Sequence, residues 1–418
     1  MNNSFETDIV LKNSFQSSVI PSLCFGEGSL SSLDKIINSC KASSGRSKDS
    51  SLWFPAWEYA ALFTGKSFLK NSGFLEIVNN IFKKNNLVLI PFEIPGEPSP
   101  ANIDNAVKEM RNKNVSLVVA IGGGSVIDAG KAASIMIKQT GGVKEYLEGV
   151  GTKTLKSAKL PFAAIPTTSG TGSEATKNSV ISIVGDNGFK KSLRHDIMVP
   201  DYAIIDPALL VSCPKSVTAW SGMDAVTQLI ESYVSTKATI FTDSLCAPAL
   251  KIAGRALPAA FADGANVEAR SGMGWAAYVS GITLANAGLG VVHGISSPAG
   301  GFSSVPHGVI CGTLLASATR YIIDKLFETD PLGEGKGLKK YAQVSSFLTG
   351  KEYTNIKDAC NALVDLLGKW TEDFDMPSLK KYGFDEALAM KTAKVSDGKN
   401  SPVALNTDDI YKIIMERV

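Results

Sequence analysis

Long apolar runs, a charge of one sign and a targeting signal are all missing from this 418-residue chain. No stretch approaches the roughly 20 apolar residues of a membrane span. The N-terminus has no basic region followed by an apolar run, so we expect neither a membrane partner nor a signal peptide. The net charge is +2 and the two signs are interspersed, which argues against a nucleic-acid partner.

Cysteine and histidine are also sparse. The six cysteines lie far apart without a Cys-x-x-Cys pair, which favours free thiols in a reducing, cytoplasmic compartment over a disulfide framework. Of only three histidines, His293 and His307 lie 14 residues apart in one glycine-rich segment. A lone histidine is usually structural, but two in one short region indicate a shared site. We interpret the third, His195, as a surface or domain-hinge residue.

Five short apolar runs in the first half are typical of buried strands. Amphipathic helical patterns, such as Ile103 to Arg111 and Ser125 to Lys138, lie between them. This alternation predicts an α/β fold with a mostly parallel sheet, in which ligands bind at the carboxyl ends of the strands. The predicted strands are Tyr59–Thr64, Leu87–Phe92, Ser116–Ile121, Phe162–Ile165 and Tyr202–Ile205.

After Pro207 the pattern changes to long helical segments, and strand patterns nearly vanish. We therefore expect an α/β domain over residues 1–207 and an all-α C-terminal domain over residues 208–418, with the site in the cleft between them. The predicted helices cover Ser216–Val234, Ser244–Ala262, Arg270–Ala287, Gly308–Ile323, Gly337–Leu348 and Asn355–Trp370.

A polar, serine-rich segment from Lys41 to Ser51 interrupts the first domain and runs into Trp53, Phe54 and Trp57. It is either a flexible surface insertion or a substrate lid or subunit contact. The sequence leaves both interpretations open.

Two polar turns follow two of the predicted strands. Gly122 to Ser125 reads GGGS and opens a helix, and Pro166 to Glu174 mixes hydroxyl side chains with two glycines. Glycines let backbone N–H groups approach a ligand, and a helix N-terminus favours a pyrophosphate. Either turn alone could be structural, but two on one sheet predict a dinucleotide site. Its expected residues are Gly123, Gly124, Ser125, Asp128, Thr167, Thr168 and Thr171.

Asp224 and Gln228 lie four residues apart on a predicted helix, so their side chains face the same way. Together with His293 and His307 they offer one carboxylate and two imidazoles, a set that suits catalytic Zn²⁺ or Fe²⁺. Taken alone, Asp224 is equally well explained as a helix N-cap.

Taken together, these motifs resemble the iron-containing (type III) alcohol dehydrogenase family. The resemblance implies a dinucleotide-binding α/β domain, a helical domain of the dehydroquinate synthase-like type, a homo-oligomer, and a divalent metal. It places the metal ligands at Asp224, Gln228, His293 and His307. The matching segments are Phe25–Ser29, Gly122–Lys131, Pro166–Glu174, Gly222–Glu231 and Asn286–Gly308.

The chain departs from the family pattern at Gln228 and Ser297, where many members carry histidine. An amide oxygen is a weaker ligand than imidazole, so three outcomes stay open. Asp224, His293 and His307 hold a metal, with Gln228 as a weak ligand or hydrogen-bond partner. Alternatively the site is metal-independent, as in other branches such as maleylacetate and phosphonoacetaldehyde reductases, or turnover is lost and a dinucleotide-binding sensor remains.

The turn after the first predicted strand, Thr64 to Ser67, bears on the choice of cofactor. The family often has aspartate at the position of Gly65, and an acidic residue there binds the ribose 2′-OH of NAD. Glycine, Lys66 and Ser67 suit a 2′-phosphate instead, so we predict NADP in preference to NAD, with Gly65 and Ser67 in the cofactor site.

The predicted reaction is hydride transfer between a nicotinamide and a small alcohol or carbonyl compound. Asp224, His293 and His307 are the expected catalytic residues. Lys190 or Lys191 could reach the cofactor or substrate, but a solvated loop charge is the simpler interpretation. A dehydroquinate synthase-type lyase would need a basic pocket, and no cluster of arginine and lysine accompanies the histidine segment.

Overall fold

The computed structural model describes residues 14–44, 57–66, 73–185 and 188–418. Six parallel strands form one sheet in the order β1-β8-β5-β4-β2-β3. The central strands β4 and β5 are buried along their whole length, which explains why they read as continuous apolar runs rather than as alternating ones. The strands are β1 (Ser22–Phe25), β2 (Tyr59–Thr64), β3 (Val88–Glu93), β4 (Leu117–Gly122), β5 (Phe162–Pro166) and β8 (Tyr202–Ile205).

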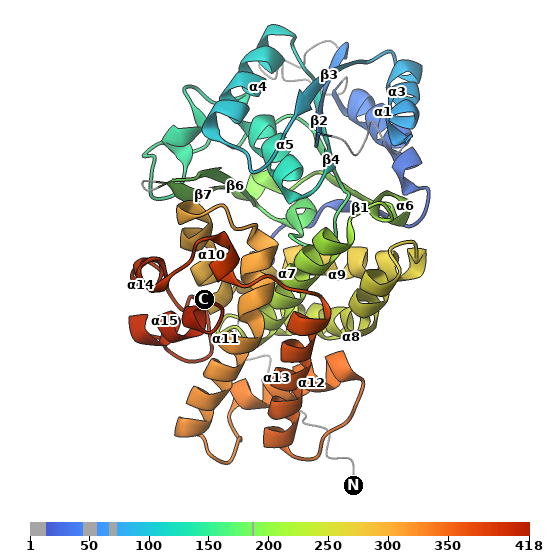
Figure 1. The fold of residues 1–418 in the computed structure, drawn as a ribbon. Coiled ribbons are helices and arrows are strands. Elements are labelled where there is room, and N and C mark those ends of the chain that lie inside the picture. Colours follow the sequence, from blue (N-terminus) through green and yellow to red (C-terminus); the bar gives the residue numbers. More distant parts are fainter. Residues whose placement is uncertain (1–13, 45–56, 67–72, 186–187) are drawn as a thin grey trace.

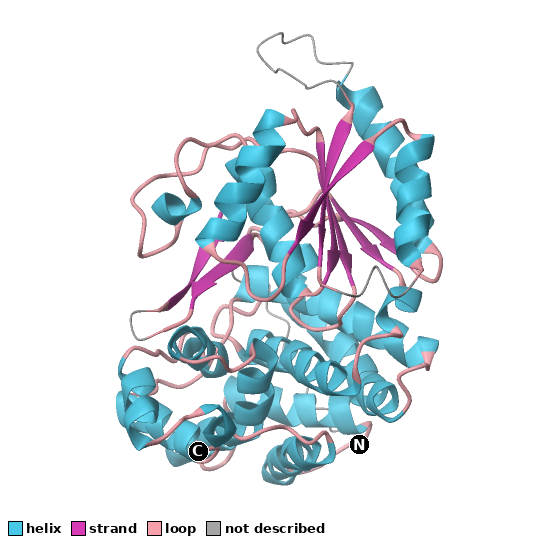
Figure 2. Ribbon diagram, turned by 45° about the horizontal axis from the view of Figure 1, so that its top comes forward, coloured by secondary structure: helices cyan, strands magenta, loops and turns pink. Residues whose placement is uncertain are grey.

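Helices cover both faces of this sheet (Figure 2). α1 (Ser32–Ser44) and α3 (Phe74–Lys84) pack on one face, through side chains such as Leu33 and Phe82. α4 (Pro100–Asn112) and α5 (Gly124–Met136) pack on the other. The predicted α/β class and all five predicted strands are confirmed.

Three strands were not predicted. β1 is short and lies at the edge of the sheet, while β6 (Asn178–Ile183) and β7 (Phe189–Arg194) form a separate antiparallel hairpin. The hairpin sequences NSVISI and FKKSLR are half polar, so they lack the apolar run that marks a buried strand. Most of the insertion, residues 45–56, and Ser67 lie outside the described residues.

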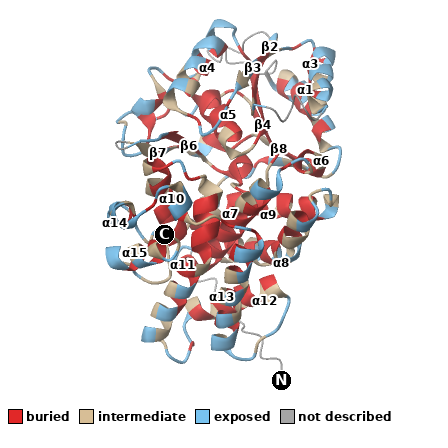
Figure 3. Cartoon of the chain, in the orientation of Figure 1, coloured by how far each residue is buried: buried red, intermediate tan, exposed pale blue. Residues whose placement is uncertain are grey.

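The second half is helical in its described part, and all six predicted helices are present (Figure 1). α7 and α9 lie at the centre of this half and are largely buried (Figure 3). The helices are α6 (Pro207–Leu210), α7 (Lys215–Val234), α8 (Ile240–Ala262), α9 (Val267–Ala287), α10 (Val291–Phe302), α11 (His307–Thr329), α12 (Lys336–Thr349), α13 (Ile356–Asp373), α14 (Glu386–Lys394) and α15 (Thr407–Met415). α10 was not predicted, because its glycines and Pro298 hide a helical pattern.

Among the described residues, α8 alone has the length and apolar composition that could cross a membrane, and α9 with α10 meets the same standard jointly but is bent by 99°. α8 packs against α7, α9 and α12, and packed core helices share this composition. The expected absence of a membrane partner stays a prediction.

The two halves meet at closely packed backbone. Gly172, after β5, has a left-handed φ of 60°, and a Cβ there would lie 2.5 Å from the Cα of Gly281 in α9. Ala203 and Ile205 of β8 pack against Tyr278 and Ile282 of α9 in a shared cluster. This contact fixes the carboxyl edge of the sheet against the helical half, although the division into two domains at residue 207 stays a prediction.

Candidate functional site

A cleft lies between the carboxyl edge of the sheet and the helical half. Gly124, Ser125 and Thr171 line it from the α/β side. His293 and His307 line it from the other side, beside Gln228 and Ser297. The structure therefore brings the predicted dinucleotide turns and the predicted metal residues to one site.

The two turns touch each other at two glycines, and at Gly124 a larger residue would clash. A Cβ on Gly124, the first residue of α5, would lie 2.5 Å from Thr171 Oγ1, and one on Gly123 would lie 3.4 Å from Thr168 Oγ1. Gly123, Gly124, Ser125, Thr168 and Thr171 are half-buried. Backbone N–H groups at the start of α5 and the threonine hydroxyls thus lie together, an arrangement that suits a pyrophosphate.

Asp128 and Lys131 connect α5 to the hairpin. The Asp128 carboxylate accepts hydrogen bonds from Ser173 Oγ and from the backbone N–H of Val180, the latter at 2.8 Å. The fully buried Lys131 Nζ donates to Thr176 Oγ1 at 2.8 Å. Burial raises the pKa of Asp128 and lowers the pKa of Lys131 to about 8. Asp128 lines the cleft, but both of its oxygens already have partners within the protein, so its role in binding the cofactor stays a prediction.

The positions of the remaining predicted cofactor residues say less about cofactor binding. Thr167 is buried, and its N–H donates to Gly122 O, so it connects β5 to β4. Gly65 directly follows β2 and is half-buried, and Lys66 beside it is exposed. Ser67 lies outside the described residues.

Asp224, His293 and His307 converge at the inner end of the cleft. Asp224 Oδ1 lies 3.3 Å from His293 Nε2 and 3.6 Å from His307 Nε2. His293 is in the first turn of α10 and His307 begins α11. A Cβ on Gly308 would lie 2.5 Å from the backbone oxygen of Trp220, so glycine there lets α11 approach α7 closely.

A fourth side chain, that of Cys311, joins this group and was not predicted. Its Sγ lies 3.6 Å from His293 Nε2 and 3.7 Å from His307 Nε2. One donor atom from each of Asp224, His293, His307 and Cys311 lies within 4.8 Å of the others. Cys311 is one helical turn after His307, and this spacing is the signal in the sequence by which it could have been predicted.

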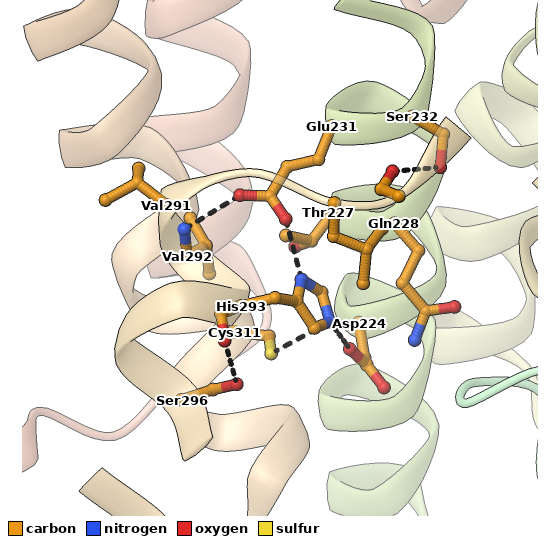
Figure 4. Close-up of polar contacts among 12 residues, drawn as sticks. Asp224, Thr227, Gln228, Glu231, Ser232, Val291, Val292, His293, Ser296 and Cys311 are labelled. Atoms are coloured by element: carbon orange, nitrogen blue, oxygen red, sulfur yellow. Dashed lines mark hydrogen bonds and ion pairs between the residues drawn. The ribbon is translucent and has the colours of Figure 1, made fainter. Parts of the chain in front are cut away.

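Glu231 is a second residue that sequence reasoning missed. It lies one helical turn beyond Gln228 on the same face of α7. One carboxylate oxygen accepts from His293 Nδ1 at 2.7 Å, and the other accepts from the backbone N–H of Val292 at 2.7 Å (Figure 4). This contact turns His293 Nε2 toward Asp224. A buried carboxylate behind a metal-ligating histidine is the usual arrangement that orients the ring.

The charges of the group depend on burial and on proximity. Burial would raise the pKa of Asp224, but the imidazoles of His307 and His293 lower it to about 2. Burial would lower the pKa of His293, but Cys311, Asp224 and Glu231 raise it well above its ordinary value. Burial dominates at His307 and lowers its pKa to about 4. Without a bound cation, His293 therefore carries a proton between two carboxylates.

These residues fit a divalent metal ion. Among the described residues, the buried Asp224 Oδ1 has no hydrogen-bond partner, although it faces the Nε2 atoms of both histidines. The His293 contact to Asp224 lies within ion-pair distance but lacks hydrogen-bond geometry. Carboxylate, imidazole and thiol groups are the ligands that Zn²⁺ and similar metals take, and such a cation would replace the proton on His293.

Lys190 corrects the expectation of a solvated loop charge. Its side chain lies in β7, is nearly fully buried, and pairs with Glu97 at the edge of the cleft. The expectation went wrong because the polar hairpin was taken for a loop. Lys191 is exposed, and His195 caps a short 3₁₀ turn by accepting from Ile197 N.

Comparison with known proteins gives this architecture a family. Residues 50–207 match the iron-containing alcohol dehydrogenase family, and residues 218–418 match the C-terminal family of Fe-containing alcohol dehydrogenases. Long-chain-alcohol dehydrogenase 1 of Geobacillus thermodenitrificans is 39% identical over 77% of this chain and 80% of its own. The NAD-dependent methanol dehydrogenase of Bacillus methanolicus is 30% identical over 80% of this chain and 88% of its own.

A solved structure shows the same fold. The crystal structure of 1,3-propanediol oxidoreductase aligns with a TM-score of 0.83 and 25% identity, over 97% of this chain and all of that one. The chain belongs to the iron-containing alcohol dehydrogenase family, and it is an NAD(P)-dependent oxidoreductase of small alcohols and their carbonyl counterparts.

Proposed function

We propose that this enzyme is a metal-assisted alcohol dehydrogenase or carbonyl reductase in which Asp224, His293 and His307 hold the divalent metal. One observation carries the proposal: Asp224 Oδ1 lies within 3.6 Å of the Nε2 atoms of both histidines, at the inner end of the cleft onto which the two turns open. When bound, the nicotinamide supplies the hydride chemistry and the metal acts as a Lewis acid toward the substrate oxygen.

The chain's own groups bind and position the reactants. The backbone from Gly123 to Ser125 and the hydroxyls of Thr168 and Thr171 hold the cofactor's phosphates. Glu231 keeps His293 in the orientation that presents Nε2 to the site. Ser297, where many family members carry histidine, lines the cleft with a hydroxyl that can hydrogen-bond a substrate but cannot carry a charge.

The test is NADPH oxidation with a panel of small aldehydes, keto acids and phosphonoaldehydes, on chelator-treated protein with and without Fe²⁺ or Zn²⁺. Turnover that returns with metal, and fails to return in Asp224→Asn, supports the proposal. Turnover that ignores metal favours a metal-independent reductase. Tight dinucleotide binding without any turnover favours a sensor.

NADP is the cofactor we propose, because no acidic side chain stands at Gly65 and the exposed Lys66 follows it. The relative from Bacillus methanolicus is NAD-dependent, so the preference is a property to be tested in this chain. We expect a higher kcat/KM with NADPH than with NADH, and a reversed preference in Gly65→Asp, because the new carboxylate repels a 2′-phosphate. A tenfold better KM for NADH in the unaltered enzyme contradicts it.

We also propose that the protein is a homo-oligomer, in the cytoplasm that its widely spaced cysteines favour. The edge strand β1 and the residues before it expose apolar side chains: Val19 is 68% exposed, Ile20 42% and Phe25 40%. Apolar side chains gathered at an open sheet edge favour pairing with another chain. Light scattering tests the oligomeric state. The native protein should have a molar mass above that of one chain, and the mass of Phe25→Asp should shift toward that of one chain. A monomeric native protein refutes the proposed oligomer.

A further inference from the structure

We propose that Cys311 completes the metal site in place of Gln228, so that the four ligands are Asp224, His293, His307 and Cys311 and the site prefers Zn²⁺ to Fe²⁺. The inference rests on the proposed metal-assisted function and adds a ligand that the family resemblance does not assign. The resemblance places the second ligand at Gln228, one turn after Asp224 on α7.

The amide of Gln228 is engaged elsewhere. Its Oε1 accepts a hydrogen bond from Ser280 Oγ of α9 at 2.7 Å, and both side chains are buried. In Figure 4 this oxygen points away from Asp224 and His293. The oxygen is the only atom of a glutamine that ligates metals, so Gln228 is left outside the group.

A rotation of the Gln228 amide defines the rival arrangement. Ser280 has a single hydroxyl proton, and the backbone oxygen of Ala277, 2.7 Å from Ser280 Oγ, competes with Gln228 Oε1 for it. If Ser280 donates to Ala277 instead, the amide turns by half a rotation, its nitrogen donates to Ser280, and its oxygen faces Asp224. Gln228 would then compete with Cys311 as a neutral ligand, so the experiment must separate the two residues.

The spacing of the donor atoms favours Cys311. Two zinc bonds of about 2.0–2.3 Å at the tetrahedral angle place their donor atoms roughly 3.3–3.6 Å apart. The separations here are 3.3 and 3.6 Å from Asp224 Oδ1 to the two imidazoles, and 3.6 and 3.7 Å from Cys311 Sγ to the same nitrogens. Four of the six donor-atom separations therefore match those around a four-coordinate ion, and a substrate oxygen would add to such an ion as a fifth ligand.

The surroundings of Cys311 supply no other function for its sulfur. Its side chain is fully buried in the apolar core of the helical half, and its polar contacts among the described residues are to His293 and His307. On coordination the thiol loses its proton to solvent and binds as a thiolate. Soft thiolate selects Zn²⁺ over Fe²⁺ when the remaining ligands are imidazole and carboxylate.

The experiment measures metal binding directly rather than activity. The full-length protein, freed of metal by a chelator, is loaded with Co²⁺ under reducing conditions, and the near-ultraviolet band of thiolate-to-cobalt charge transfer is recorded. Zn²⁺ and Fe²⁺ affinities are then measured by competition with chelators. The variants are Cys311→Ser and Gln228→Ala, with Cys246→Ser as the matched control, because Cys246 is also fully buried but lies in α8 outside the site.

The native protein and Cys246→Ser should both show the charge-transfer band, and Cys311→Ser should lack it. Zn²⁺ affinity should fall in Cys311→Ser by more than the roughly 10–100-fold that loss of an outer-sphere partner costs, and should hold in Gln228→Ala. Native protein that binds Co²⁺ without the band, or a loss of affinity in Gln228→Ala alone, overturns the inference while the metal-assisted function stands. Failure of the native protein to bind any of these metals overturns both.

Discussion

Replacing Glu231 by glutamine should weaken metal binding without changing a ligand. Both carboxylate oxygens of Glu231 accept hydrogen bonds, one from Val292 N–H and one from His293 Nδ1, each at 2.7 Å. An amide has only one acceptor oxygen. If that oxygen keeps Val292, the amide NH₂ faces His293 Nδ1 and forces the ring to carry its proton on Nε2. That nitrogen is the one directed at Asp224, and a protonated nitrogen cannot bind a metal.

The expected loss of metal affinity follows from the role of Glu231 as a hydrogen-bond partner of a ligating histidine. Loss of an outer-sphere hydrogen bond to a ligating histidine costs about 10–100-fold in metal affinity, which is roughly 1.4–2.7 kcal/mol. Zn²⁺ affinity, measured by competition with a chelator, should fall by that factor in Glu231→Gln, while Glu268→Gln, an exposed position in the first turn of α9, should leave it unchanged. Equal Zn²⁺ affinity in Glu231→Gln and the native protein would refute the proposed orientation of His293.

Three further changes test the packing and the charges around the cleft. Gly281→Ala places a Cβ 2.2 Å from the backbone oxygen of Gly172; because backbone must move, we expect a loss of about 1–3 kcal/mol in unfolding free energy and weaker dinucleotide binding. Burial raises the pKa of Glu174 from 4.5 to about 7, so its ionisation destabilises the native state increasingly from pH 4.5 to 7, by roughly 3 kcal/mol at most; Glu174→Gln should be more stable than the native protein at pH 8 in urea titrations. Glu97→Gln leaves the buried Lys190 without its partner and should lower the melting temperature.

Each of these three predictions has a control measurement. Gly368 has open space around it, so Gly368→Ala should not destabilise; an equal loss in both glycine variants would show that contact with Gly172 is not the cause. Glu148→Gln breaks an exposed pair with Arg194, where little stability is at stake, so it should change the melting temperature less than Glu97→Gln. A stability profile of Glu174→Gln that parallels the native one from pH 5 to 8 would contradict a raised pKa at that residue.

The α/β half was largely predictable because its strands are buried on both faces. Val118, Val119 and Ala120 of β4 have no exposed surface, and burial of that kind leaves a continuous apolar run in the sequence. β1 and the β6–β7 hairpin lack such a run, because their burial depends on neighbours distant in the chain. Lys190 was misjudged for the same reason: only the folded hairpin brings it to Glu97.

The site divides in the same way. Asp224, His293 and His307 were found because their residue types are rare or lie in recognisable motifs. Glu231 and Cys311 lie at helical spacings from Asp224 and His307 that could have been noticed, but spacing alone does not show that α7, α10 and α11 present those faces to one point. Only the packing of the three helices makes a carboxylate and a thiol part of the site.

Gln228, where many family members carry histidine, and Cys311 bear on the same proposed metal site. A chain that lacks histidine at position 228 and keeps its other three ligands would be left with a weak amide oxygen at the fourth position. Here the amide is bonded to Ser280, and a thiol one turn beyond His307 lies at the distance that a fourth ligand needs. In the proposed site, Cys311 supplies the fourth ligand that Gln228 does not. Loss of histidine at position 228 is, on this argument, evidence for a different metal preference and not for a dead site.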